Sequence, residues 1–178
     1  IRTQWCLNEG LDAIKITSFH IADKKLLEFT AKSFKTIFLS TGMCTIEEVK
    51  SAVNVLKKVE RLYLLHCVSD YPTKFEDVNL KVMDELRRYC EHVGYSDHTL
   101  NTTAVLAAVA RGAEVIEKHF TLSKNLPGTD HILSATPKEF KEMVTEIRNI
   151  EKVLGTNLKK MTELEAKNQE FLRRRFTY

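Results

Sequence analysis

The chain has 178 residues, of which 43% are hydrophobic and 29% are charged. This apolar fraction can build a sizeable core in one domain or part of one, which excludes a disordered tail. Lys and Arg outnumber Asp and Glu by only 27 to 24 and are scattered, so no nucleic-acid partner is indicated. A small anionic metabolite remains a suitable ligand.

The cysteines and the apolar runs are typical of a cytoplasmic protein. Cys6, Cys44, Cys67 and Cys90 lack the spacing of a zinc site or a disulfide framework, so we expect them to be reduced and mostly buried. No run approaches the ~20 apolar residues of a membrane span, and no membrane partner is expected. The first residue is Ile1 without a signal sequence behind it, so we expect a processed start or a fragment.

Five short runs rich in apolar and β-branched residues predict strands. Most of these runs are continuously apolar, as in strands that are buried on both faces of a parallel sheet. The predicted strands cover residues 12–16, 36–39, 62–65, 93–95 and 115–116.

Helical patterns lie between and after these strands. Thr45 and Thr136 each begin a capping box with Glu three residues later, and Gly112 and Gly155 are suitable helix ends. The predicted helices cover residues 24–32, 45–56, 79–91, 99–111 and 136–154.

Alternating strands and helices indicate the βα units of a parallel α/β fold. Neither GxGxxG nor GxxxxGK[ST] follows a strand, which disfavours a nucleotide-binding open sheet and favours a (β/α)8 TIM barrel. Such a barrel needs eight strands and about 250 residues. With five predicted strands, the sequence indicates only part of one.

Functional groups of such barrels lie where the strands end. Hydroxyls, two lysines, histidines and carboxylates stand there in this chain: Lys15, Thr17, Ser18, Ser40, Thr41, His66, Ser69, Asp70, Tyr71, Ser96, Asp97, His98, Glu117, Lys118 and His119. Neither GxSxG nor HExxH is present, so covalent hydrolase chemistry is unsupported.

Lys15 lies within an apolar strand, and two interpretations of it stay open. An unpaired ammonium there would be costly, so Lys15 could extend to the solvent or pair with a carboxylate of the core. Alternatively, Lys15 with Ser18, Ser40 and Ser96 would bind a phosphate or carboxylate.

His98 and His119 stand at the ends of neighbouring predicted strands. Each could be a separately hydrogen-bonded structural histidine. Together, with Asp97 beside one and Glu117 beside the other, they would suit a Mn, Fe or Zn site with open positions for substrate.

The segments at the strand ends resemble the sialic acid synthase family, which includes legionaminic and pseudaminic acid synthases and spore-coat polysaccharide synthases. The resemblance covers residues 13–174, in six ordered segments: KITSF, FLSTGM, LLHCVSDYPTKFEDVNL, GYSDHT, EKHFTL and LPGTDHILSATPKEF.

This resemblance implies a (β/α)8 barrel of which only about the last five βα units are present. Residues 1–158 would be the C-terminal part of the barrel. Residues 159–178 would begin a linker toward an antifreeze-like capping domain that this chain lacks. Members of the family are domain-swapped homodimers in which this domain caps the partner's active site.

The implied reaction condenses phosphoenolpyruvate with an N-acetylated amino sugar, such as N-acetylmannosamine, to a nine-carbon 2-keto acid and phosphate. By resemblance, Lys15, Glu117 and Asp130 would be catalytic, and His98 and His119 would bind a divalent metal, usually Mn²⁺, with Mg²⁺ or Co²⁺ as alternatives. The implied substrate-binding residues are Lys15, Ser18, Ser40, Ser69, Tyr71, Ser96, Glu117, Asp130 and His131.

Two other hypotheses stay open. The chain could be an inactive fragment or non-catalytic subunit of such a synthase, because an incomplete barrel exposes strand edges and apolar surface. It could also be another metal-dependent barrel aldolase or condensing enzyme, which the requirement for phosphoenolpyruvate would distinguish.

Overall fold

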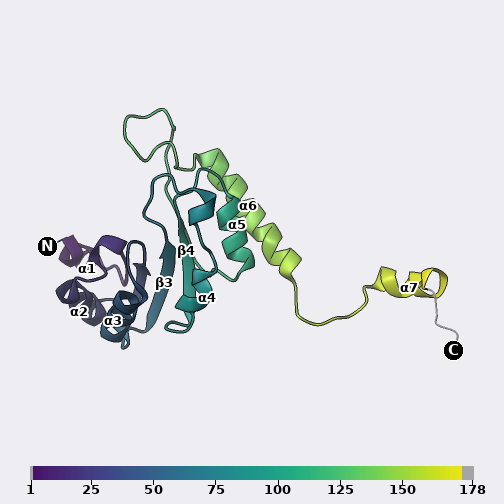
Figure 1. The fold of residues 1–178 in the computed structure, drawn as a ribbon, viewed down its shortest axis with the longest axis horizontal. Coiled ribbons are helices and arrows are strands. Elements are labelled where there is room, and N and C mark those ends of the chain that lie inside the picture. Colours follow the sequence, from purple (N-terminus) through teal and green to yellow (C-terminus); the bar gives the residue numbers. More distant parts are fainter. Residues whose placement is uncertain (1, 174–178) are drawn as a thin grey trace.

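A five-stranded parallel sheet is the centre of the computed structural model, which describes residues 2–173 (Figure 1). The strands are β1 (Ala13–Ile16), β2 (Thr36–Ser40), β3 (Arg61–Cys67), β4 (His92–Asp97) and β5 (Ile116–Lys118). The helices are α1 (Arg2–Asn8), α2 (Lys24–Ser33), α3 (Ile46–Leu56), α4 (Val82–Leu86), α5 (Thr103–Ala110), α6 (Pro137–Leu154) and α7 (Glu163–Leu172). All five predicted strands and the α/β class are confirmed.

The core lies between the helices and one face of the sheet. Ile16, Leu39, Leu64 and Val93 are direct partners across β1 to β4, and all four are buried. They pack with Leu27 of α2 and other apolar side chains of the helices in one cluster. Because side chains alternate along a strand, the residues on either side of this row point to the opposite face.

The opposite face carries the row formed by Lys15, Phe38, Tyr63 and His92. The rings of Phe38 and Tyr63 stack with centroids 5.0 Å apart, and those of Tyr63 and His92 lie 4.9 Å apart. These side chains are only partly buried. Toward the carboxyl ends of the strands, this same face becomes polar.

Capping boxes begin three helices. Both predicted boxes, at Thr45 and Thr136, form with the Glu three residues later and start α3 and α6. A third box at Thr162 starts α7 in the same way. Our prediction missed α7 although the sequence carries its start signal, and it also missed α1.

Two predicted helices are shorter than expected. Of residues 79–91, only α4 is α-helical, because Asn79 has a left-handed φ of 47° and turns flank the helix on both sides. The helix predicted over 99–111 begins at Thr103, whose N–H donates to the side chain of Asn101 at 3.0 Å. In both cases side-chain or turn hydrogen bonds replace the first helical turn.

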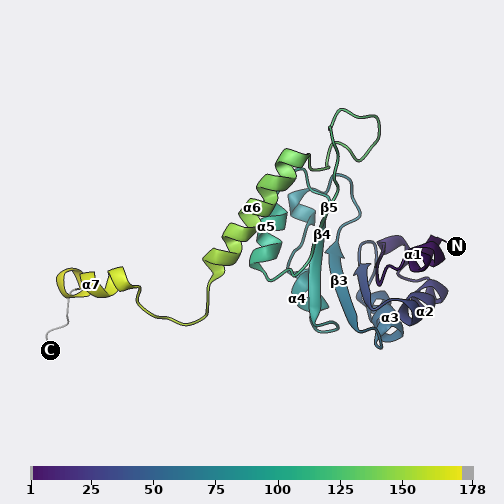
Figure 2. The same cartoon turned by 180° about the vertical axis from the view of Figure 1, so that it is seen from behind.

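The chain beyond α6 lies apart from the sheet (Figures 1 and 2). An irregular segment follows Leu154, and α7 lies beyond it, where the side chains of Leu164, Phe171 and Leu172 are exposed. The predicted boundary between 158 and 159 falls in this segment, and positions 174–178 of the predicted linker are outside the described residues. No helix within residues 2–173 has the length and apolar character needed to cross a membrane.

All four cysteines are free, as predicted, but only Cys67 is buried. The expectation that most would be buried is therefore wrong. Cys6, Cys44 and Cys90 lie at the margin of the core, where they pack against it while remaining partly accessible.

Candidate functional site

A cavity of about 360 Å³ lies at the carboxyl end of the sheet. Its lining comes from all five strand ends and consists of Lys15, Thr17, Ser18, Phe19, Ser40, Cys67, Tyr71, Ser96, His98, Glu117, Lys118 and His119. Of the predicted site residues, only Ser69, Asp130 and His131 are not in this lining. Strand ends that are far apart in the sequence thus form one site.

Strand register explains why these side chains converge. Cys67 on β3 is the direct partner of Ser96 on β4, which is in turn the partner of Glu117 on β5. Partners in a register row point to the same face, so all three point into the cavity.

Lys15 and Glu117 form an ion pair across the cavity, with Nζ and Oε1 3.0 Å apart. The side chains are 28% and 40% exposed, so the pair is open to a ligand. Lys15 thus pairs with a carboxylate, as one interpretation expected, but that carboxylate belongs to the cavity and not to the core. An ammonium in this position can still bind an anion because it has further N–H donors.

Three buried polar atoms have no hydrogen-bond partner within residues 2–173: Ser40 Oγ and Glu117 Oε2, whose residues line the cavity, and Ser69 Oγ, which lies beside Gly42. Buried polar atoms are normally paired, and leaving one unpaired costs about 1–3 kcal/mol. These two hydroxyl donors and this carboxylate acceptor can therefore each form a hydrogen bond to a ligand. A ligand that offers both anionic oxygens and a donor would satisfy all three.

Gly42 brings the polypeptide backbone close to these hydroxyls. Its N–H donates to Ser18 Oγ at 2.9 Å, and the Ser18 hydroxyl itself donates only a long hydrogen bond, to Cys67 Sγ at 3.8 Å. A Cβ at this position would lie 2.4 Å from Ser69 Oγ and 3.0 Å from Ser18 Oγ. Only glycine fits there without displacing the serine side chains.

His98 and His119 also line the cavity, and their ring centroids are 5.3 Å apart. Nδ1 of His98 donates to the carbonyl oxygen of Val68 at 2.6 Å, so Nε2 keeps its lone pair. Burial lowers the pKa of His98, and the neighbouring His119 lowers it further. Both effects favour the neutral imidazole that metal binding requires.

Tyr71 covers the imidazole pair. Its ring lies 4.2 Å from that of His98 and 5.9 Å from that of His119, measured between centroids. The side chain remains 41% exposed, so it forms part of the cavity mouth.

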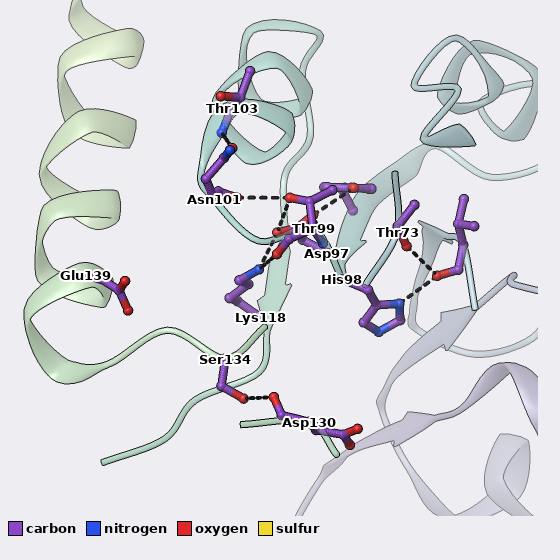
Figure 3. A network of polar contacts seen from close by, with 12 residues as sticks. Thr73, Asp97, His98, Thr99, Asn101, Thr103, Lys118, Asp130, Ser134 and Glu139 are labelled. Atoms are coloured by element: carbon purple, nitrogen blue, oxygen red, sulfur yellow. Dashed lines mark hydrogen bonds and ion pairs between the residues drawn. The ribbon is translucent and has the colours of Figure 1, made fainter. Parts of the chain in front are cut away.

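Asp97 does not belong to this imidazole pair, contrary to our expectation. Its side chain is fully buried on the helix-facing side, where it binds Lys118 at 2.7 Å (Figure 3). The reason is the strand alternation: Ser96 and His98 point into the cavity, and the residue between them points away.

Asp130 and His131 lie in the loop between β5 and α6. Asp130 Oδ2 is 3.8 Å from His119 Nδ1, so this carboxylate stands beside the imidazole pair. His131 instead bonds Thr121 Oγ1 through Nδ1 at 2.8 Å, and the structure does not bring it to the cavity. Ser134 Oγ donates to the Asp130 carbonyl oxygen and holds the base of the loop.

Four lining residues, Thr17, Phe19, Cys67 and Lys118, were missing from the predicted site, although Thr17 and Lys118 were named among the groups at the strand ends. Cys67 could have been found from strand alternation, because it is two residues after Leu65 on the same face. Phe19 could not, because the turn after β1 determines where its ring lies.

The two imidazoles suit a divalent cation only in part. Within residues 2–173, no three His, Cys, Asp or Glu side chains gather as a complete ligand set. Two neutral imidazoles and a nearby carboxylate fit a cation such as Mn²⁺ whose other positions are filled by water or substrate.

Comparison with known proteins decides the family. A family model described as the NeuB family matches residues 3–159. The chain belongs to the NeuB family. This confirms the resemblance seen in the sequence.

Individual curated proteins are similar to most of this chain. N,N'-diacetyllegionaminic acid synthase of Campylobacter jejuni is 47% identical over 174 residues, covering 94% of this chain and 52% of its own length. An uncharacterized protein of Methanocaldococcus jannaschii is 52% identical over 153 residues, covering 84% of this chain and 45% of its own.

The fold agrees with solved structures of the family. The crystal structure of N-acetylneuraminic acid synthetase from Leptospira borgpetersenii superposes with a TM-score of 0.83 at 39% identity, over 93% of this NeuB-family chain and 60% of that one. The chain spans about half the length of the curated relatives that it matches.

Proposed function

We propose that this NeuB-family chain supplies much of the active site of a synthase that condenses phosphoenolpyruvate with an N-acetylated amino sugar of the N-acetylmannosamine type. The products are a nine-carbon 2-keto sugar acid and phosphate. The observation that carries the proposal is that one cavity is lined by Lys15, by serine hydroxyls of which Ser40 is unpaired, and by the imidazole pair. The similarity to legionaminic acid synthases supports the same reaction class.

Lys15 and the serines would bind phosphoenolpyruvate. The ammonium and the hydroxyls of Ser18, Ser40 and Ser96 offer charge-assisted hydrogen bonds to a phosphate and a carboxylate. Ser69 would add a further donor, since its hydroxyl is also unpaired. No basic surface is needed for this, because a few donors in a partly closed cavity suffice.

His98 and His119 would hold the divalent cation, for which we propose Mn²⁺. When bound, such a cation supplies Lewis-acid polarisation of the acceptor's aldehyde oxygen. The carbonyl of Val68 fixes the tautomer of His98, which keeps Nε2 available. Tyr71 covers both rings and limits the access of water to them.

Glu117 and Asp130 would contact hydroxyls of the acceptor sugar. Glu117 Oε2 is buried without a donor, so a substrate hydroxyl or a water molecule would satisfy it. Asp130 Oδ2 lies 3.8 Å from His119 Nδ1, and its side chain is exposed. Both carboxylates would therefore be able to accept hydrogen bonds from the sugar.

Carbon 3 of phosphoenolpyruvate would attack the aldehyde carbon of the sugar and form the new C–C bond. The carbonyl oxygen takes up a proton, and carbon 2 gains cationic character. Water then adds to carbon 2. Cleavage of the bond between carbon 2 and the phosphate ester oxygen releases phosphate and leaves the 2-keto acid. The residues of the cavity contribute mainly by holding both substrates in register and by stabilising charge.

We further propose that the complete enzyme is a (β/α)8 barrel, a homodimer and cytoplasmic. The first and last strands of the sheet, β1 and β5, each pair on one side only, and further βα units would complete the barrel there. We therefore expect the isolated chain to be inactive or to require a complementary segment.

Release of phosphate from phosphoenolpyruvate tests the proposal. The chain, alone and with a complementary barrel segment, is assayed with an N-acetylated or diacetylated hexosamine, with Mn²⁺ and with a chelator. We expect turnover that needs phosphoenolpyruvate, sugar and metal, and that His98→Ala abolishes.

His92→Ala is the matched control. His92 begins β4, the strand that ends directly before His98, but it lies outside the cavity and bonds Glu114 at 2.8 Å. It should leave turnover unchanged. Turnover that needs no metal and survives His98→Ala would refute the proposed chemistry.

A further inference from the structure

A buried ion pair lies directly behind the imidazole pair. Lys118 Nζ and Asp97 Oδ2 are 2.7 Å apart, and their side chains are 3% and 0% exposed. Asp97 and Lys118 are direct partners in the register of β4 and β5. Each is therefore followed by one of the two histidines.

The pair is part of a nearly saturated polar network (Figure 3). Asp97 also accepts hydrogen bonds from the Tyr95 hydroxyl at 2.9 Å and from the N–H of Thr99 at 3.1 Å. Lys118 Nζ also donates to the carbonyl oxygen of Thr99. The network thus ties the end of β5 to the turn that leaves β4.

Stability alone does not explain such a pair. Desolvating two charges costs several kcal/mol per ion, and apolar replacements of a buried pair are often neutral or stabilising. What the pair does fix is the relative position of two strand ends. Residues of the same strands that alternate with it, Ser96 and Glu117, point into the cavity.

His119 depends most on this arrangement. Within the described residues its ring makes no hydrogen bond, whereas His98 is anchored to Val68. The backbone of His119 is held at Lys118 on one side and by Ala135, whose N–H donates to the His119 carbonyl oxygen at 2.8 Å, on the other. A shift of β5 would therefore move this imidazole relative to its partner.

We infer that Lys118 and Asp97 are positioning residues, which hold His98 and His119 at the separation that joint binding of a divalent cation requires. This inference rests on the proposed function. It assigns a role in metal binding to a buried pair whose two charged groups bind each other.

The test replaces both charges together. Lys118→Met with Asp97→Asn removes the ion pair without leaving one charge unpaired, so the double variant should keep its fold and melting temperature within a few degrees. Mn²⁺ affinity, measured by electron paramagnetic resonance of free Mn²⁺, should fall about 10- to 100-fold, as is usual when support behind a metal ligand is lost. Lys118→Gln with Asp97→Asn serves as a second variant should the first one unfold, because it also removes both charges and its two amides can hydrogen-bond to each other, and the same fall in Mn²⁺ affinity is expected.

The matched control makes the same change in an ion pair outside the cavity. Lys124 and Glu139 are also 2.7 Å apart, and Lys124→Met with Glu139→Gln should leave Mn²⁺ affinity unchanged. A folded double variant of Lys118 and Asp97 with wild-type Mn²⁺ affinity would overturn the inference.

A readout without metal separates this inference from the proposed function. The ring protons of His98 and His119 lie beside the Tyr71 ring, so their NMR shifts report the arrangement. In the double variant these shifts should change while those of His20 do not, and unchanged shifts would refute positioning. If the wild type bound no Mn²⁺, the metal role would fail, and the NMR comparison would still decide the positioning.

Discussion

Gly42→Ala should weaken anion binding without unfolding the protein. Gly42 has no left-handed φ, so its backbone accommodates alanine. The new Cβ would stand 2.4 Å from Ser69 Oγ, against about 3.3 Å for an ordinary close contact between carbon and oxygen. The serine hydroxyl must therefore move by roughly 1 Å, out of hydrogen-bonding reach of a bound anion.

The size of the effect follows from the bond that is lost. A hydrogen bond to a charged group contributes about 1.5–3 kcal/mol, which corresponds to about 10- to 150-fold in affinity. Ser18 Oγ, 3.0 Å from the new Cβ, would shift by only a few tenths of an ångström and add little. Titration calorimetry with inorganic phosphate and with phosphoenolpyruvate measures the change.

Gly10→Ala is the control, with the opposite expected pattern. Gly10 has a φ of 76°, and nothing lies within 4 Å of a Cβ there. Alanine should cost about 1–2 kcal/mol of stability through backbone strain and leave phosphate binding unchanged. Wild-type phosphate affinity in Gly42→Ala would refute the argument that the serines around Gly42 bind the anion.

Three further predictions concern charge, core and pH. Lys15→Met should lower phosphate affinity at least about tenfold in the same titration, and an unchanged affinity would exclude Lys15 from the anion site. Leu64→Ala, at a fully buried position of β3, should lower the free energy of unfolding in urea by about 2–5 kcal/mol, and a loss below about 1 kcal/mol would contradict its place in the core. The hydrogen bond from Lys124, with those from Thr136, lowers the pKa of Glu139 to about 2 from 4.5. Because a depressed carboxyl pKa stabilises the fold above the unfolded-state value, this contribution should be lost as pH falls from about 4.5 to about 2. Because solvent partly screens this side chain, we expect the contribution to the free energy of unfolding to be only about 1 kcal/mol. Glu139→Gln should therefore lose less stability than the wild type as the pH falls. Identical stability profiles against pH would contradict this prediction.

Strand positions and most of the cavity lining could be predicted because both follow from local patterns. Continuous apolar runs mark buried strands, and in a parallel sheet the residues after each run must meet at one edge. Lys15, Ser40, Ser96 and Glu117 were found in this way.

The direction of a side chain at a strand end is harder to predict than the position of the strand. Asp97 was expected beside the imidazoles because it is adjacent to His98 in the sequence. Successive side chains of a strand point to opposite faces of the sheet, however, so Asp97 points away from them. The prediction that His131 lies at the cavity was wrong for another reason. Its position depends on a hydrogen bond to Thr121 within an irregular loop, and no periodic sequence pattern indicates such a bond. The shortened helix over 79–91 has the same origin, since Asn79 adopts a backbone conformation that its sequence context does not reveal.

The strands of the sheet lie in the same order as they occur in the chain, β1-β2-β3-β4-β5. During synthesis, each new strand can therefore pair directly with the strand that was made before it. No later strand has to be inserted between two strands that have already paired. Sheet growth can keep pace with synthesis, one βα unit at a time, which limits how long any open strand edge is exposed to other chains.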